Sequence, residues 1–361
     1  MIDNLRKIHI SSQDTLKTYK EAGQRLCGYV SNLIPVEIIH ASGMMPVRIE
    51  PRFSSHNLAD SLLPTFVCEH GRGCLESGLA GEYTDLDGTV FTRTCDVFRN
   101  LYTLWINNVP AGFSYYLSTP GNINRESMEY FSEELKRFKI FLQKQQGYLI
   151  SDDDLKSSIQ LYNRIRDRLR ILSLSGILSG KDLFHLFHAS HHIDPQEFYD
   201  EIDNLNLENM EKPNSTVKLA ITGSHFSDPG IITTIEDLGI HVAILDLDFG
   251  PRSVWLNVEE EDDPLKSLAN RYIKSAAFDP SKHPSTERVN FLLSLIRSVK
   301  TDGIVVMNQK YCDPYLFEES LMKKTFEEEG IPSFFITIGE RLEHKQQLIN
   351  RIEAFVEMIE K

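Results

Sequence analysis

The sequence contains two similar segments, LDGTVFTRTCD at residues 86–96 and TDGIVVMNQKYCD at residues 301–313. Each begins with Asp-Gly, continues through an apolar, β-branched run that is typical of a buried strand, and ends in Cys-Asp. A helical pattern and then a second strand-like run follow each segment, VPAGFSYYL at residues 109–117 and GIPSFFI at residues 330–336. The repeat predicts two α/β units, each with a Cys-Asp pair just beyond the carboxyl end of a parallel strand, where open α/β sheets bind ligands.

Other apolar runs extend this pattern along the chain. Seven runs that alternate with helical patterns predict parallel strands, at residues 46–49, 89–92, 112–117, 217–222, 242–245, 303–307 and 332–336. Residues 17–29 are expected to be helical, with Cys27 in the core. We therefore expect an amino-terminal α/β lobe over residues 1–126, a mainly helical connecting region over 127–212, and a carboxyl-terminal α/β lobe over 213–361, with a linker at residues 209–216.

Length and composition limit the class of protein. The 361 residues, 41% hydrophobic and 25% charged, are enough for two cores and exclude a disordered or collagen-like chain. The net charge of −14 argues against nucleic acid or an anionic membrane surface as a partner. The amino-terminal residues lack the pattern of a secretory signal, and no apolar run approaches the ~20 residues of a membrane span. A cytoplasmic location is expected.

Five cysteines, at positions 27, 68, 74, 95 and 312, are too scattered for a disulfide framework. Cys68 lies in PTFVCEHGRGC, residues 64–74, at the expected start of a helix, where backbone N–H groups favour a thiolate. Cys68, Cys95 and Cys312 would bring one sulfur from each of three loops to one cleft. Thiolates bind zinc or an iron–sulfur cluster, and wide spacing favours a cluster over a compact zinc knuckle. The alternative is that they are small buried side chains; Cys74 is a less favoured further ligand.

Two other patterns allow more than one interpretation. Helical spacing would place His185, His188 and His192 on one face as candidate metal ligands, but no carboxylate or cysteine pattern accompanies them or His191, which favours a solvated or interface helix. TGSH at residues 222–225 follows a predicted strand and either presents N–H groups to a phosphate or forms a plain turn before a helix near residue 227. Walker A, GxSxG and HExxH patterns do not occur, which excludes P-loop ATP hydrolysis, common serine esterase chemistry and zincin proteolysis.

Several stretches together resemble the 2-hydroxyacyl-CoA dehydratase and benzoyl-CoA reductase subunit family. They are residues 29–48, Cys68, and residues 86–96, 235–252, 310–313 and 347–355, in an order that covers residues 28–357. The resemblance implies two flavodoxin-like lobes with a [4Fe-4S] cluster in the cleft, held by Cys68, Cys95 and Cys312. It also implies a heterodimer with a related second subunit, and a separate ATP-dependent iron–sulfur activator that delivers one electron at a time.

The reaction implied by this resemblance is a radical elimination of water. One electron would enter the thioester carbonyl of a 2-hydroxyacyl-CoA, and the ketyl radical anion would expel its 2-hydroxyl. Proton loss at carbon 3, in a syn- or anti-elimination, and return of the electron would then give a 2-enoyl-CoA. Glu37 and His40 are the expected proton carriers, with a helix-surface or capping role as the alternative. Arg48, Arg252 and Lys310 are expected to bind the CoA phosphates, since guanidinium and ammonium groups suit phosphate.

The sequence leaves related functions open. The same family includes benzoyl-CoA reductase subunits, which reduce an aromatic ring, and double-cubane cluster reductases, for which Cys74 is the nearby spare thiol. A cluster-free binding or scaffold subunit belongs to a different class, and iron and sulfide content would separate it from the enzymes.

Overall fold

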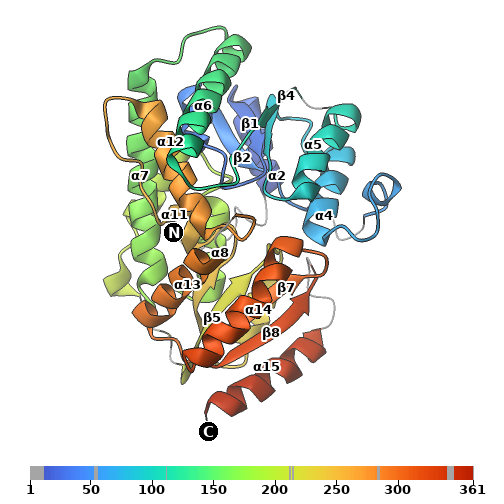
Figure 1. Cartoon of the computed structure of the whole chain (residues 1–361), viewed down its shortest axis with the longest axis vertical. Coiled ribbons are helices and arrows are strands. Elements are labelled where there is room, and N and C mark those ends of the chain that lie inside the picture. The colour runs from blue at the N-terminus through green and yellow to red at the C-terminus, as the bar shows by residue number, and fades with distance from the viewer. Residues whose placement is uncertain are drawn as a thin grey trace.

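The structure, a computed structural model, describes residues 12–52, 56–110, 112–210, 213, 215–282, 285–339 and 345–360. These residues form two four-stranded parallel sheets with helices around them, one in the upper and one in the lower half of Figure 1. The first sheet has the order β2-β1-β3-β4 and the second the order β6-β5-β7-β8. The strands are β1 (Arg25–Tyr29), β2 (Met44–Arg48), β3 (Gly88–Thr92), β4 (Phe113–Leu117), β5 (Val217–Gly223), β6 (Ile240–Asp246), β7 (Gly303–Gln309) and β8 (Ser333–Ile338).

All seven predicted runs form strands, but the prediction of a helix over residues 17–29 is wrong at its carboxyl end. Helix α2 (Ser12–Glu21) stops before Gly23, whose φ of 86° lies in the left-handed region, and β1 follows. This strand is central in its sheet and buried from Leu26 to Tyr29, so its sequence lacks the alternation that marks a half-exposed strand. Cys27 is fully buried, as expected of a core thiol.

The Asp-Gly pairs of the repeat have the same position in both lobes. The backbone N–H of Leu26 donates to Asp87 Oδ2 at 2.8 Å, and the N–H of Asp87 donates to the carbonyl of Leu26 at 2.8 Å. Lys218 and Asp302 make the equivalent bonds at 2.7 and 2.8 Å. In each lobe the aspartate therefore connects the start of the third strand to the first strand. The two copies of the repeat thus have equivalent positions and contacts in the two lobes.

Helices connect the strands and separate the two sheets along the chain. They are α3 (Val36–Ala41), α4 (Glu69–Leu79), α5 (Asp96–Asn108), α6 (Arg125–Gln146), α7 (Asp152–Leu174), α8 (Gly180–Ala189), α9 (Pro195–Asp203), α10 (Gly230–Glu236), α11 (Pro251–Val254), α12 (Pro264–Ser275), α13 (Ser285–Val299), α14 (Asp313–Glu328) and α15 (Lys345–Ile359), with 3-10 turns at Ala59–Ser61, Leu207–Asn209 and Ala276–Phe278. Ser151 and Asp154 form a capping box at the start of α7. Of the expected linker at residues 209–216, positions 211, 212 and 214 lie outside the described residues.

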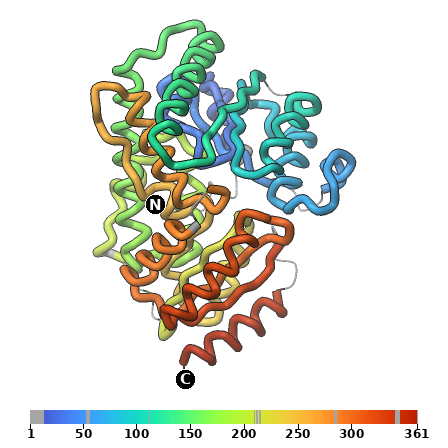
Figure 2. The backbone as a smooth tube through the Cα atoms, viewed as in Figure 1, coloured from blue at the N-terminus to red at the C-terminus, as the bar shows by residue number. Residues whose placement is uncertain are grey.

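The two halves of the chain are interleaved rather than simply joined. Helix α12 returns from the carboxyl-terminal half to pack against α6, and Figure 2 shows the two segments side by side. Leu268 and Tyr272 of α12 consequently belong to the same hydrophobic core as the first sheet. Among the described helices, none has both the length and the apolar character that a bilayer span requires.

Candidate metal centre between the lobes

Three cysteines occupy the same position relative to a helix. Cys68 is the N-cap residue of α4, Cys95 of α5 and Cys312 of α14. Cys95 follows β3 and Cys312 follows β7, so the Cys-Asp pairs lie at the carboxyl ends of the third strand in each lobe, as predicted. At an N-cap a sulfur lies next to backbone N–H groups without helical partners and at the positive end of the helix dipole, which favours the thiolate.

The structure brings these three sulfurs together. Cys68 forms a hydrogen bond with the thiol of Cys312, and this bond, with burial, raises the pKa of Cys312 well above its usual range. Burial, together with the nearby Cys68, raises the pKa of Cys95 to about 11. Hydrogen bonds from the backbone N–H groups of Phe98 and Val97 lower this pKa but do not offset the rise. Three adjacent thiolates repel one another unless a cationic centre compensates them, so the donor set fits an iron–sulfur cluster or zinc.

Two cavities meet at the cysteines. The inner cavity has a volume of about 80 Å³ and the outer one about 390 Å³, and all three cysteines line both. The inner wall includes Phe98, Val30 and Tyr315, while the outer wall includes Arg93, Lys282 and Phe317. The sulfurs therefore lie between a small, partly apolar cavity and a wider one whose wall carries both basic and acidic side chains.

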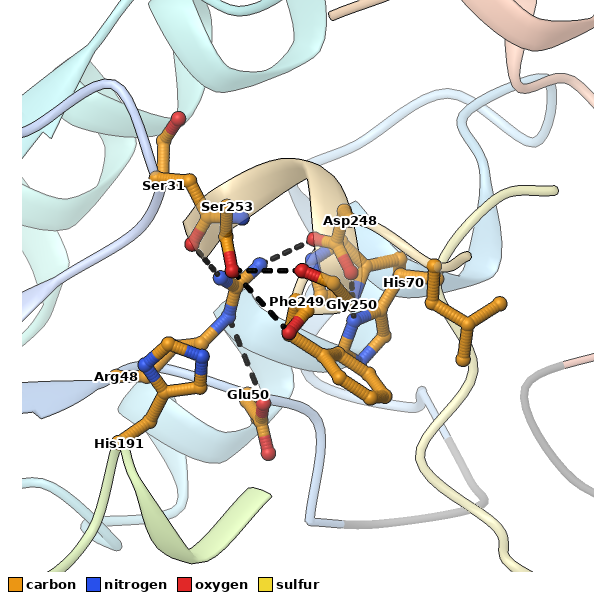
Figure 3. Close-up of polar contacts among 12 residues, drawn as sticks. Ser31, Arg48, Glu50, His70, His191, Asp248, Phe249, Gly250 and Ser253 are labelled. Atoms are coloured by element: carbon orange, nitrogen blue, oxygen red, sulfur yellow. Dashed lines mark hydrogen bonds and ion pairs between the residues drawn. The ribbon is translucent and has the colours of Figure 1, made fainter. Parts of the chain in front are cut away.

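A buried polar network borders the inner cavity and joins the lobes. The rings of His70 and His225 lie 3.9 Å apart, and His225 Nδ1 lies 3.0 Å from Asp248 Oδ1. Asp248, which follows β6, pairs with Arg48 at the end of β2 (Figure 3). Arg48 Nη1 also donates to Asn32 Oδ1 at 2.7 Å. The sequence does not reveal this network because its members come from separate segments that share no local motif.

The predicted proton carriers lie elsewhere. Glu37, on α3, is fully buried, pairs with Arg166 of α7 and accepts a hydrogen bond from the Tyr272 hydroxyl at 2.7 Å. Burial raises the pKa of Glu37. The positive charges of Arg166 and Arg271 outweigh this effect, so the net shift of the pKa is downward. His40 Nδ1 lies 2.9 Å from Ser158 Oγ, beside a separate cavity of about 930 Å³. Neither Glu37 nor His40 lines the cysteine cavities.

The three predicted phosphate ligands differ in their exposure to solvent. Arg48 is 1% exposed and paired with Asp248, and Arg252 is buried and donates to the Tyr315 hydroxyl at 2.6 Å. Lys310 is exposed, with its Nζ 4.8 Å from the ring centre of Tyr311, which lines the outer cavity. Of these three basic residues, Lys310 alone is open to a dissolved phosphate.

Cys74 does not join the other three. It lies inside α4, fully buried, with its Sγ 3.8 Å from the carbonyl of Ile49 and 4.0 Å from His70 Nε2. It lines neither cavity. The structure therefore assembles a set of three thiols rather than four.

The TGSH segment is a turn that contributes His225 to the polar network. Gly223 has a φ of 148°, and a side chain there would collide with the carbonyl of Met307. Helix α10 begins at Gly230, later than the expected start near residue 227. The turn places His225 against Asp248.

The interpretation of the histidine cluster as a solvated or interface helix is wrong. His185, His188 and His192 are buried, and a carboxylate accompanies two of them, His188 and His192. Glu50 reaches His188 from the end of β2, with 3.0 Å between Oε2 and Nε2. The sequence could not show this partner because Glu50 and His188 are far apart in the chain.

Comparison with known proteins finds relatives that match nearly the whole chain. The model of the family described as 2-hydroxyglutaryl-CoA dehydratase, D-component, matches residues 32–359. The (R)-phenyllactyl-CoA dehydratase beta subunit of Clostridium sporogenes is 25% identical, over 95% of this chain and 94% of that protein. A benzoyl-CoA reductase subunit of Thauera aromatica is 24% identical, over 95% and 93%. The beta subunit of (R)-2-hydroxyglutaryl-CoA dehydratase from Acidaminococcus fermentans is 22% identical, over 99% of both chains. Because the family model spans nearly the whole sequence, this chain belongs to the 2-hydroxyglutaryl-CoA dehydratase D-component family.

Proposed function

We propose that this chain is the iron–sulfur subunit of a 2-hydroxyacyl-CoA dehydratase, and that Cys68, Cys95 and Cys312 hold a [4Fe-4S] cluster. The observation that carries the proposal is the convergence of three N-cap cysteines, from both lobes, on one pair of cavities. Relatives named as dehydratase subunits for phenyllactyl-, 2-hydroxyglutaryl- and lactoyl-CoA support the reaction class. The strand order, which is the same in both sheets, agrees with flavodoxin-like lobes.

A bound [4Fe-4S] cluster with three protein thiolates supplies one-electron transfer at low potential and one iron with an open position. The protein's part is to hold the sulfurs and to keep water away. The N–H groups of Val97 and Phe98 stabilise negative charge on the Cys95 sulfur. The ring of Phe98 walls the inner cavity, and exclusion of water there strengthens the electrostatic interactions.

The outer cavity is the proposed entry for the acyl-CoA. Arg93 and Lys282 line it, and Lys282 Nζ donates to the carbonyl of Arg93 at 3.2 Å. Lys310 is exposed near its rim. Asp96 and Asp313 also line the cavity, so its charge is mixed, and Lys282 is largely buried. The guanidinium of Arg93 and the ammonium groups of Lys282 and Lys310 suit the phosphates of CoA. Arg48 and Arg252 take no part in this proposal because neither lines the outer cavity.

The proposed partners are a related second subunit and an ATP-dependent iron–sulfur activator. The relatives are themselves named as subunits, which supports the first of these partners. The chain itself has no P-loop motif to hydrolyse ATP. None of the five cysteines forms a disulfide, which agrees with a reducing compartment such as the cytoplasm.

A benzoyl-CoA reductase subunit is the second candidate, because the Thauera relative is 24% identical, against 25% for the phenyllactyl-CoA dehydratase relative. A double-cubane cluster is less well supported, since Cys74 lies away from both cavities.

The test is an anaerobic assay of the protein copurified with its partner subunit from its native cells. Activator, ATP and a reductant are added, with either a set of 2-hydroxyacyl-CoA esters or benzoyl-CoA. We expect formation of a 2-enoyl-CoA, and its loss in the Cys95→Ser variant but not in Cys74→Ser. Ring reduction of benzoyl-CoA without dehydration would support the second candidate instead, and turnover of neither substrate would contradict both.

A further inference from the structure

Glu50, His188 and His192 form a second group of metal-ligating side chains, apart from the cysteines. Glu50 follows β2, His188 lies in the last turn of α8, and His192 lies in the turn after it. The three residues are between 1% and 5% exposed. Glu50 Oε2 lies 3.0 Å from His188 Nε2 and 3.9 Å from His192 Nε2. Both rings thus direct the same nitrogen at one carboxylate oxygen, and the rings stack with centroids 4.2 Å apart.

The hydrogen bonds of His192 fix its tautomer. Its Nδ1 lies 2.9 Å from the backbone carbonyl of His188, and because a carbonyl only accepts, Nδ1 carries the hydrogen. In the neutral form of this ring the other nitrogen, Nε2, carries no hydrogen. Its Nε2 therefore presents a lone pair toward Glu50 Oε2. A lone pair and a carboxylate that face each other repel unless a cation lies between them.

Arg48 does not supply a close counter-charge for Glu50. Arg48 is paired with Asp248, and its Nε lies 3.5 Å from Glu50 Oε1, longer than an ordinary hydrogen bond (Figure 3). Among the described residues, Glu50 Oε1 has no hydrogen-bond partner although it is buried.

We propose that Glu50, His188 and His192 bind one divalent transition-metal ion, with zinc as the preferred ion. Two imidazole nitrogens and one carboxylate oxygen are a common zinc donor set, and two histidines four residues apart suit one ion. The bond from His192 Nδ1 to a backbone carbonyl is the kind of outer contact that orients a ligating imidazole.

The ion would act as a clamp between β2 and the end of α8. The N–H of Arg48 already donates to the carbonyl of His191 at 3.1 Å, so the two segments are in register there. Arg48 also pairs with Asp248 of the other lobe. A metal ion at Glu50 would therefore fix the end of β2, which contributes this contact between the lobes. This inference stands apart from the proposed function, since none of the three ligands lines a cysteine cavity.

The test is zinc analysis of the anaerobically purified holoprotein, combined with X-ray absorption at the zinc edge. We expect about one zinc per chain with a first shell of nitrogen and oxygen only, as a His-His-Glu set requires. His192→Ala and Glu50→Gln should each lose most of the zinc and retain their iron. His241→Ala, which removes a buried histidine of β6, is the matched control and should keep both metals.

The absorption measurement decides the question even where a variant does not fold. A zinc-free wild-type protein that is folded, or zinc with sulfur in its first shell, would overturn the proposal. Retention of zinc by a folded His192→Ala variant would overturn it as well.

Discussion

Glu37 and Arg166 are a buried ion pair, with side chains 0% and 5% exposed. Glu37 also accepts a hydrogen bond from Tyr272 of α12, so one carboxylate links α3, α7 and α12. The sequence suggests a proton carrier here because it shows a titratable residue in a signature stretch but not the arginine that neutralises it. A carboxylate enclosed in this way stabilises the fold and is poorly placed to exchange protons with a substrate.

Removal of this charge should therefore destabilise the protein. Glu37→Gln leaves the Arg166 guanidinium buried without its counter-charge, and we expect a loss of about 3–5 kcal/mol in the free energy of unfolding. Urea denaturation measures it, with Glu133→Gln on the exposed face of α6 as a control that should change little. Wild-type stability combined with complete loss of turnover would show that Glu37 is catalytic instead.

Asp248 gives a pH dependence with a definite sign. Burial raises the pKa of Asp248, but Arg48 and His225 outweigh it, so its folded pKa lies well below the unfolded value of about 4. A depressed carboxyl pKa adds stability that is present above the unfolded pKa and disappears as the pH falls through the folded pKa. Asp248→Asn should therefore be less stable than wild type at neutral pH, and the difference should shrink in strong acid. Thermal unfolding across pH measures this, and a pH-independent difference would contradict it.

At the scale of elements, the second lobe depends on one arginine. Arg288 of α13 donates to Asp246 at the end of β6 and to Glu318 of α14, each at 2.9 Å, and all three side chains are fully buried. Replacing Arg288 would leave the carboxyl groups of Asp246 and Glu318 buried without their counter-charge.

We expect Arg288→Met to lower the free energy of unfolding by about 3–5 kcal/mol. The same substitution at Arg297, on the same helix, breaks an ion pair with Glu329 in which both side chains are largely exposed, and should change stability by about 0–1 kcal/mol. Denaturant unfolding of the two variants compares them directly, and equal effects would contradict this account of α13.

The elements also show what the sequence can and cannot predict. Strands such as β3 and β7 are readable because an apolar, β-branched run ends in turn residues. β1 is not readable because it is a short central strand whose residues are buried on both faces, and a run of that kind has no period to detect. The place of the Cys-Asp pairs is predictable because the repeat marks it locally. The pairing of Glu50 with His188, and of Arg48 with Asp248, is not, since it depends on how distant elements pack.

At the scale of the whole molecule, the candidate metal centre exists only where the lobes meet. Cys68 and Cys95 come from the first lobe and Cys312 from the second. A contact between lobes holds this arrangement, since the N–H of His70 donates to Gln309 Oε1 at 3.0 Å. Length and charge predict a two-lobe chain with an anionic surface, but the packing of α12 on the first lobe is visible only in the fold.

The central claim is that three cysteines hold a [4Fe-4S] cluster, and iron and acid-labile sulfide in the anaerobically purified protein test it most directly. We predict about four iron and four sulfide per chain, with most of both lost in Cys68→Ser, Cys95→Ser and Cys312→Ser and retained in Cys74→Ser. A folded wild-type protein without iron, or a folded Cys95→Ser variant with its full iron content, would contradict the account.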